Sequence, residues 1–176
     1  MLYVEDSCSL TEEHRRFFDY VQEAEFPWFF QKDLSNDGNI MHLFVHNLML
    51  RDPNLRPVEG IINSPYYDIC IEIFKKFCDE HKIPVNKIFR AALNSTFYNT
   101  NRQSRIHTDH KFEHKNFILY INEFKNGQTC IFDKNNTLLK KVEPGLYKAV
   151  VFSGEPHAHN YCAPNERRVI LVITFD

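Results

Sequence analysis

The sequence lacks the features that mark several specialised classes of protein. Among its 176 residues there is no apolar run long enough to cross a bilayer, and residues 1–6 have neither the basic nor the apolar region of a secretory signal. Lysine plus arginine (21) and aspartate plus glutamate (23) nearly balance, so no positive excess supports tight nonspecific binding to nucleic acid. We therefore expect a cytoplasmic protein with no membrane anchor and no nucleic-acid signature.

Cysteine motifs are also missing. The cysteines are odd in number and scattered, and no C-x-x-C pair occurs among Cys8, Cys70, Cys78, Cys130 and Cys162. This pattern favours reduced thiols in a reducing compartment over a disulfide framework. His42 and His46 have the i, i+4 spacing of helical metal ligands, but no H-E-x-x-H motif accompanies them, so metal binding there is the weaker interpretation.

The size and composition fit an ordinary globular domain. A chain of this length most simply forms one domain, 1–176, and can bury roughly 70% of its unfolded surface without staples. Sixteen Phe and eight Tyr favour a β-sheet core. No internal repeat or low-complexity stretch divides the chain.

Residues 1–86 predict a helical N-terminal support region. The stretch from Ser9 to Glu12 has the form of a capping box for a helix over 13–24. Ser64-Pro65 has the form of an N-cap followed by proline at the first helical position, for a second helix that ends near Glu80. Between them, residues 40–50 fit either a strand or an irregular core segment.

Residues 87–176 change to short segments rich in β-branched and aromatic residues, separated by polar turns. Strands are predicted over 87–98, 117–122, 129–133, 137–142, 146–152 and 169–175. Helices followed by a run of strands predict an α+β fold, mainly β, with the helices packed on one of two antiparallel sheets. A jelly roll, or double-stranded β-helix, is the closed arrangement that uses about eight such strands.

A candidate metal site lies in the second half. His107-x-Asp109 is followed about fifty residues later by His157 and His159, and then by Arg167 and Arg168. Two imidazoles and one carboxylate can occupy one face of an octahedral Fe(II) and leave three positions open. The neighbouring His110 and His114 suggest zinc less well, because no cysteine follows at finger-like spacing. We interpret them as rim residues of the cleft.

Taken together, a series of motifs resembles the Fe(II)/2-oxoglutarate-dependent oxygenase family, in its prolyl-4-hydroxylase-like branch. The motifs occur in the family's order over roughly residues 87–176. They are Arg90-Ala91-x-x-Asn94, His107-Thr108-Asp109, Leu119-Tyr120-Ile121-Asn122, Asn126-Gly127-Gln128-Thr129, Val142-x-Pro144-x-x-Tyr147, Val151-Phe152-x-Gly154-x-Pro156-His157-Ala158 and Arg167-Arg168-Val169-Ile170-Leu171-Val172. Family members often carry Gly-Gly-Glu-Thr where this chain has residues 126–129, which changes the turn.

The resemblance implies the roles of the site residues. His107, Asp109 and His157 would bind the metal. His159 is the alternative to His157, but the Pro-His-Ala context favours His157. Arg168, with Arg167 as the alternative, would bind the distal carboxylate of 2-oxoglutarate. The other residues implied at the cosubstrate are Asn94, Tyr98, Tyr120 and Thr129. Fe(II), 2-oxoglutarate and O₂ are the implied cofactors, with ascorbate as an optional reductant.

The implied reaction is hydroxylation of a second substrate, with release of succinate and CO₂. A peptidyl residue, proline first, is the substrate that the resemblance favours; a nucleobase or a free small molecule is the alternative. Asp109 argues against a halogenase, which needs the carboxylate position vacated. A jelly-roll binding module without catalysis is the other class of function. The cationic run from Arg102 to Lys115 is either a solvated loop or a surface for an acidic or phosphate-bearing substrate.

Overall fold

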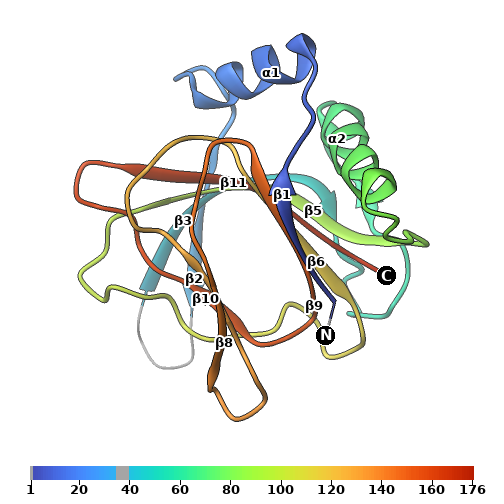
Figure 1. The fold of residues 1–176 in the computed structure, drawn as a ribbon. Helices are drawn as coiled ribbons and strands as arrows, with labels where there is room; N and C mark the ends of the chain where they lie inside the picture. Colours follow the sequence, from blue (N-terminus) through green and yellow to red (C-terminus); the bar gives the residue numbers. More distant parts are fainter. Residues whose placement is uncertain (1, 35–39) are drawn as a thin grey trace.

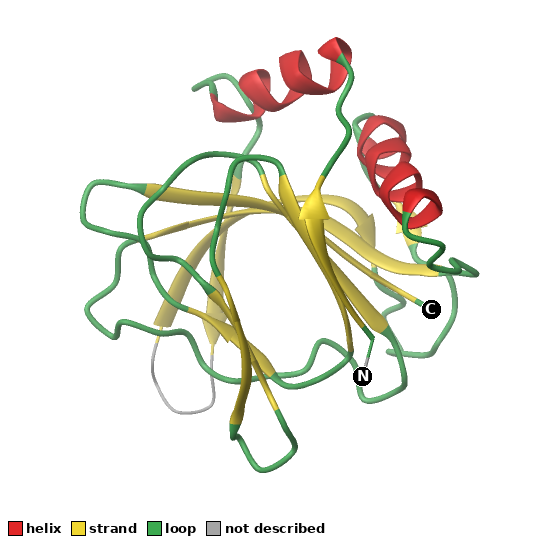
Figure 2. Cartoon of the chain, viewed as in Figure 1, coloured by secondary structure: helices red, strands yellow, loops and turns green. Residues whose placement is uncertain are grey.

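The computed structural model describes residues 2–34 and 40–176, without the side chains of residues 32–42. The described chain is mainly antiparallel β structure (Figure 1, Figure 2). In chain order its elements are β1 (Tyr3–Ser7), α1 (Glu12–Gln22), β2 (Phe29–Leu34), β3 (Ile40–Leu50), β4 (Ile61–Ile62), α2 (Tyr67–Glu80), β5 (Ile88–Phe97), β6 (Lys115–Tyr120), β7 (Thr129–Phe132), β8 (Leu138–Val142), β9 (Lys148–Ser153), β10 (His157–His159) and β11 (Arg167–Phe175).

The strands form two sheets that face each other (Figure 1). The larger sheet has the order β1-β9-β6-β11-β5-β3-β2, with β4 paired to β3, and the smaller sheet has the order β10-β7-β8. Every pair of neighbouring strands is antiparallel. This arrangement is a jelly roll, and the predicted fold class is confirmed.

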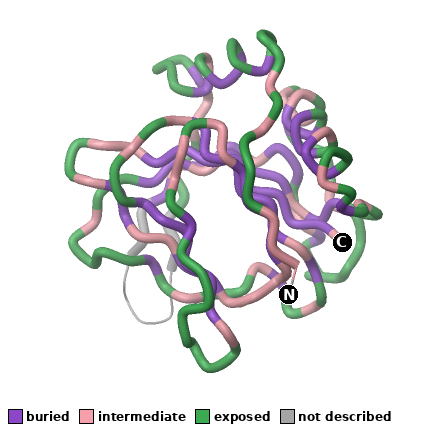
Figure 3. The backbone as a smooth tube through the Cα atoms, viewed as in Figure 1, coloured by how far each residue is buried: buried purple, intermediate pink, exposed green. Residues whose placement is uncertain are grey.

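The helices cover the face of the larger sheet that points away from the smaller sheet (Figure 1). Because successive side chains of a strand point to opposite faces, each strand of the larger sheet serves two cores. On β5, Ala91 and Leu93 pack with Phe74 of α2 beneath the helices, whereas Ala92 joins the core between the sheets. Figure 3 shows that the buried backbone follows the strands of the larger sheet and the helix faces turned toward it.

The N-cap of each helix lies two residues later than the sequence predicted. Thr11, not Ser9, is the N-cap of α1: its hydroxyl accepts from the backbone N–H of His14, and the His14 ring reaches back to the Thr11 N–H. Histidine therefore takes the place that glutamate has in a standard capping box. Tyr66, not Ser64, precedes α2, and the Ser64 hydroxyl accepts from the Tyr66 N–H. Neither helix in the described ranges is long and apolar enough to cross a membrane.

The N-terminal half also contributes strands, which corrects the expectation of a helical region. β1 pairs with β9 at one edge of the larger sheet, and residues 40–50 are the strand β3, which pairs with β5. The sequence did not predict β1, because β1 is an edge strand whose residues from Glu5 to Ser7 are exposed, and it therefore lacks the alternation of apolar and polar residues that marks a half-buried strand. The sequence also did not predict β10 in the C-terminal half, since this strand is only three residues long.

His46 has a structural role. Its Nδ1 lies 2.8 Å from the Pro27 carbonyl oxygen and its Nε2 lies 2.7 Å from the Ser64 hydroxyl. Both ring nitrogens are therefore occupied, and the imidazole ties the start of β2 to the segment before α2. The side chain of His42, the second member of that candidate pair, lies outside the described residues. The five cysteines are free thiols, as predicted, and all except Cys8 are buried.

Candidate metal centre

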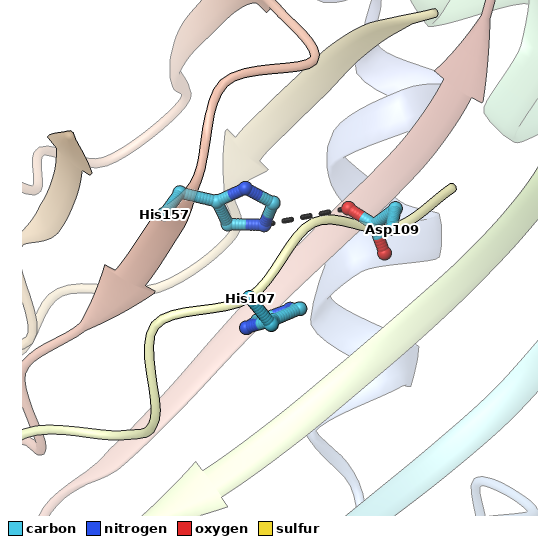
Figure 4. A group of neighbouring side chains, drawn as sticks. All are labelled: His107, Asp109 and His157. Atoms are coloured by element: carbon cyan, nitrogen blue, oxygen red, sulfur yellow. Dashed lines mark ion pairs between the residues drawn. The ribbon is translucent and has the colours of Figure 1, made fainter. Parts of the chain in front are cut away.

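The loop between β5 and β6 and the start of β10 bring His107, Asp109 and His157 together. His107 and His157 form a backbone bridge, in which each N–H donates to the other residue's carbonyl over 3.0 and 2.8 Å. One ligand atom from each of the three side chains lies within 4.8 Å of the others. Figure 4 shows the two imidazoles and the carboxylate converging. His157 is the first residue of β10 and follows the turn after β9.

The two imidazoles are oriented alike. His107 Nδ1 lies 3.1 Å from the Arg105 carbonyl oxygen, and His157 Nδ1 lies 3.1 Å from the Glu155 carbonyl oxygen. An Nδ1–H that donates to a carbonyl leaves the Nε2 lone pair free for a metal, and fixes the direction in which it points. Two imidazole nitrogens and one carboxylate oxygen are a donor set that suits Fe(II), with room for further ligands.

The electrostatics of the cluster favour a cation. The Asp109 side chain is 8% exposed, and its Oδ2 lies 3.3 Å from His157 Nε2. Burial alone would raise the pKa of Asp109, but the hydrogen bond and charge of His157, together with Arg90, hold that pKa well below its usual range. Burial would likewise lower the pKa of His157, but the Asp109 carboxylate raises it above the ordinary value. A metal ion would replace the proton that this pair otherwise shares.

The cluster opens into a cavity of about 320 Å³ between the two sheets. Arg168 lines this cavity, is 2% exposed, and is held by donating from Nε to the Gly127 carbonyl (3.0 Å) and from Nη2 to the Thr129 hydroxyl (3.2 Å). Arg167 points to the other face of β11, where its guanidinium donates to the Gln22 carbonyl at the end of α1. Of the two adjacent arginines, the structure therefore brings Arg168 to the cavity.

The remaining predicted cosubstrate residues divide in two. Asn94 and Thr129 line the cavity, and the buried Tyr120 hydroxyl lies 2.7 Å from the Thr129 hydroxyl. Tyr98 does not line it: β5 ends at Phe97, and Tyr98 is 51% exposed beside a separate cleft. The family resemblance implied a role for Tyr98 at the cosubstrate, but the chain turns outward at that point.

Three cavity-lining side chains carry a buried polar atom that has no hydrogen-bond partner in the described chain. They are Asn94 through Oδ1, Thr96 through Oγ1 and His159 through Nε2. Burial and the nearby Arg168 lower the pKa of His159 well below its ordinary value, so this imidazole is neutral. Unpartnered buried polar atoms need a ligand or water, and here they surround the space beside Arg168. The Arg168 guanidinium and the Thr96 hydroxyl can donate to an anionic, oxygen-rich molecule, whereas Asn94 Oδ1 is an acceptor and needs a donor such as water.

His110 and His114 are buried, which corrects the expectation that they form the rim of the cleft. His110 Nε2 lies 2.8 Å from the Thr174 hydroxyl, and its ring stacks on Phe112 with 4.5 Å between centroids. His114 Nδ1 lies 2.8 Å from the Phe112 carbonyl oxygen. Burial and the neighbouring His114 lower the pKa of His110 to about 4. The loop after Asp109 folds inward because Phe89 and Phe112 offer an aromatic pocket.

Two arginines at the metal cluster were not predicted as site residues. Arg90 Nη1 lies 3.6 Å and Arg51 Nη2 lies 4.0 Å from Asp109 Oδ1. The alternation of β5 could have revealed Arg90, because it shares a strand face with Asn94 and Thr96. No local signal marks Arg51, which follows β3 and reaches Asp109 only through the fold.

Comparisons with known proteins agree with this architecture. No protein-family model matches the sequence, and no curated protein is significantly similar to it. Among solved structures, a 2OG-Fe(II) oxygenase family oxidoreductase from Burkholderia pseudomallei has a TM-score of 0.76 at 14% identity, over 99% of this chain and 84% of that one. A Pseudomonas putida prolyl-4-hydroxylase has a TM-score of 0.60 at 15% identity, over 98% of this chain and 91% of that one.

A prolyl hydroxylase from Trichoplax adhaerens, in complex with a hypoxia inducible factor peptide fragment, has a TM-score of 0.62 at 10% identity. It matches over 98% of this chain and 82% of that one. At these identities the likeness establishes the fold alone. The chain has the fold of the 2-oxoglutarate- and Fe(II)-dependent oxygenases, as the motif resemblance implied.

Proposed function

We propose that the protein is an Fe(II)- and 2-oxoglutarate-dependent oxygenase that hydroxylates a second substrate. One observation carries this proposal: two imidazoles and a buried carboxylate converge at the same cavity that the buried Arg168 lines. His107, His157 and Asp109 would hold Fe(II). Bound together, Fe(II), 2-oxoglutarate and O₂ would supply the oxidative decarboxylation of the keto acid and the oxidation of a C–H bond.

The chain's own residues bind and orient the cosubstrate in this proposal. The distal carboxylate of 2-oxoglutarate meets the Arg168 guanidinium, whose planar fork suits a carboxylate. The Gly127 carbonyl and the Thr129 hydroxyl fix the guanidinium, and Tyr120 in turn fixes Thr129. The Thr96 hydroxyl could donate to the ligand, and Asn94 Oδ1 and His159 Nε2 would pair with water that the ligand orders.

We further propose a peptidyl residue, with proline first, as the second substrate, and the cytoplasm as the location. The Trichoplax neighbour was solved with a peptide, and the Pseudomonas neighbour is a prolyl-4-hydroxylase. Free, largely buried cysteines suit a reducing compartment. A mass-spectrometric search for +16 Da products in peptide pools tests the substrate, and a product on a nucleobase or free small molecule instead would overturn it.

The reaction is tested by incubating the purified protein with Fe(II), 2-oxoglutarate and ascorbate in air, and measuring succinate. The parent protein should release succinate, and a chelator or the substitution Asp109→Ala should abolish it. A binding module would release none even when metal and keto acid are bound. An Asp109→Ala variant as active as the parent would refute the assignment of the metal ligands; circular dichroism confirms that the variant is folded.

A further inference from the structure

Arg51 and Arg90 form a pair of cations at the metal end of the cavity. Both line the cavity, and both approach the same oxygen of Asp109, at 4.0 and 3.6 Å. Arg51 also donates from Nη1 to the Asp109 backbone carbonyl over 3.2 Å. Arg90 is 16% exposed, and among the described residues Asp109 is its only ion-pair partner. Both arginines therefore support the Asp109 carboxylate, but the proposed function places neither of them in contact with the metal or with 2-oxoglutarate.

The pair lies far from the arginine that would bind 2-oxoglutarate. On the pairing of β5 with β11, Arg90 lies opposite Thr174, and Thr96 lies opposite Arg168. Arg90 and Thr96 are six residues apart on one strand, which corresponds to roughly 20 Å at about 3.4 Å per residue. The pair and Arg168 are therefore at opposite ends of the cavity, and they cannot share one carboxylate of a small keto acid.

The charges that line the cavity do not balance. Among the residues whose side chains the structure describes, Arg51, Arg90 and Arg168 line the cavity with a single carboxylate, that of Asp109, which leaves an excess of two positive charges when the histidines are neutral. A divalent cation and a dianionic keto acid cancel each other, so binding both leaves this excess in place. Asp109 would by then share its charge with the metal. Arg51 is 36% exposed and reaches solvent, but Arg90 is only 16% exposed and requires an anionic partner to offset its desolvation.

We propose that Arg51 and Arg90 bind an oxyanion, a carboxylate or a phosphate, carried by the second substrate. This inference rests on the proposed function, and it adds a substrate class to it: the molecule that is hydroxylated bears a negative group close to the oxidised C–H bond. Two guanidinium groups offer several N–H donors to one oxyanion, which a neutral substrate would leave unused. Arg105 is exposed and belongs to the cationic run from Arg102 to Lys115, in the loop that also carries Asp109. It would attract such a substrate toward the mouth of the cavity.

The test uses Mn(II) in place of Fe(II), because Mn(II) accelerates the nuclear relaxation of molecules held near it. Protein in excess is loaded with Mn(II) and 2-oxoglutarate, and the relaxation of water protons reports both binding events. Methylphosphonate (by ³¹P) and acetate (by ¹³C) are then added as separate probes, which distinguishes phosphate-like from carboxylate ligands. The same samples with Mg(II) give the diamagnetic baseline.

We expect at least one probe to relax faster with the parent protein. The enhancement should fall roughly tenfold or more in Arg51→Gln and in the double variant Arg51→Gln/Arg90→Gln, because charged hydrogen bonds are lost. Arg16→Gln, which removes the same charge from an exposed position on α1, should match the parent. If replacement of the buried Arg90 prevents folding, the Arg51→Gln variant alone still decides the test.

Equal enhancement in the parent and both arginine variants, with Mn(II) and 2-oxoglutarate still bound, would overturn the inference and leave the proposed function intact. No enhancement in the loaded parent would do the same. Failure of the parent to bind Mn(II) or 2-oxoglutarate, seen in the water signal, would overturn the proposed function and this inference with it.

Discussion

Replacing Arg168 with methionine tests the cosubstrate end of the cavity. Methionine keeps much of the length and apolar volume of arginine but removes the charge and both observed hydrogen bonds, to the Gly127 carbonyl and the Thr129 hydroxyl. Because the arginine is 2% exposed, no solvent would substitute for it. The distal carboxylate of 2-oxoglutarate would then be buried without a cation.

The expected loss follows from that burial. Leaving one member of a buried ion pair without its partner costs about 3–5 kcal/mol. At about 1.4 kcal/mol for each factor of ten, the dissociation constant of 2-oxoglutarate should rise roughly 100- to 5,000-fold. The metal should still bind, because its three ligands are unchanged.

Calorimetric titration of 2-oxoglutarate into Mn(II)-loaded protein measures this change directly. Arg167→Met is the matched control: it removes the same group from the adjacent residue, whose guanidinium donates to Gln22 on the other face of β11. Its affinity for 2-oxoglutarate should equal that of the parent. Unchanged affinity in Arg168→Met, or an equal loss in Arg167→Met, would refute the placement of the cosubstrate.

Three further perturbations test the surroundings of the site. Gly127→Ala should destabilise the fold by about 1–3 kcal/mol in thermal unfolding, because residue 127 has φ +69° and an added Cβ would meet the Phe124 ring. The Cβ would also lie 3.3 Å from Arg168 Cδ, so 2-oxoglutarate binding should weaken. A stable variant with parental affinity would contradict this. Asp109 raises the pKa of His157, so a proton competes with the metal for this imidazole up to a pH above 6.5. When Mn(II) affinity is measured from pH 8 to 5.5, it should fall by up to about tenfold per pH unit below the pKa of His157. A flat profile would count against His157 as a ligand. The pKa of His110 is lowered to about 4, so on acidification this histidine is protonated in the unfolded chain before it is protonated in the folded one. The free energy of unfolding should therefore decrease as pH falls from about 6.5 to 4, by at most about 1.4 kcal/mol per pH unit. In urea unfolding, His110→Asn should show a shallower pH dependence than the parent, and an identical pH dependence would exclude His110 as the source.

The sequence predicted the C-terminal strands well because their signal is local. Segments such as β6 and β11 are runs of β-branched and aromatic residues, and turn residues bound them. The N-terminal strands carry a weaker signal. β1 places exposed acidic residues at the edge of a sheet, where pairing with β9 decides its conformation. Long-range pairing of that kind cannot be inferred from local composition.

The candidate site shows the same division. Motif spacing grouped His107, Asp109 and His157 and favoured Arg168 over Arg167, and the structure places these side chains accordingly; their binding of metal and cosubstrate stays a prediction. Tyr98, for which the resemblance also implied a role, lies outside the cavity, because the direction of a chain after a strand end depends on tertiary contacts.

The arginines that surround Asp109 were beyond the reach of motif analysis. Arg51 lies 58 residues before Asp109 in the chain, and no periodicity relates the two. Their contact exists because β3 and β5 are neighbours in the larger sheet, which brings the segment after β3 to the mouth of the cavity. Charge balance within a cavity can be judged only once the fold has determined which side chains line it.

Crystals grown with Mn(II) and 2-oxoglutarate would test the central claim most directly, by anomalous scattering from the metal. We expect one anomalous peak bonded to Nε2 of His107, Nε2 of His157 and the Asp109 carboxylate, with the keto acid extending from it toward Arg168. A peak at any other set of residues, or none at a saturating concentration of Mn(II), would contradict the account.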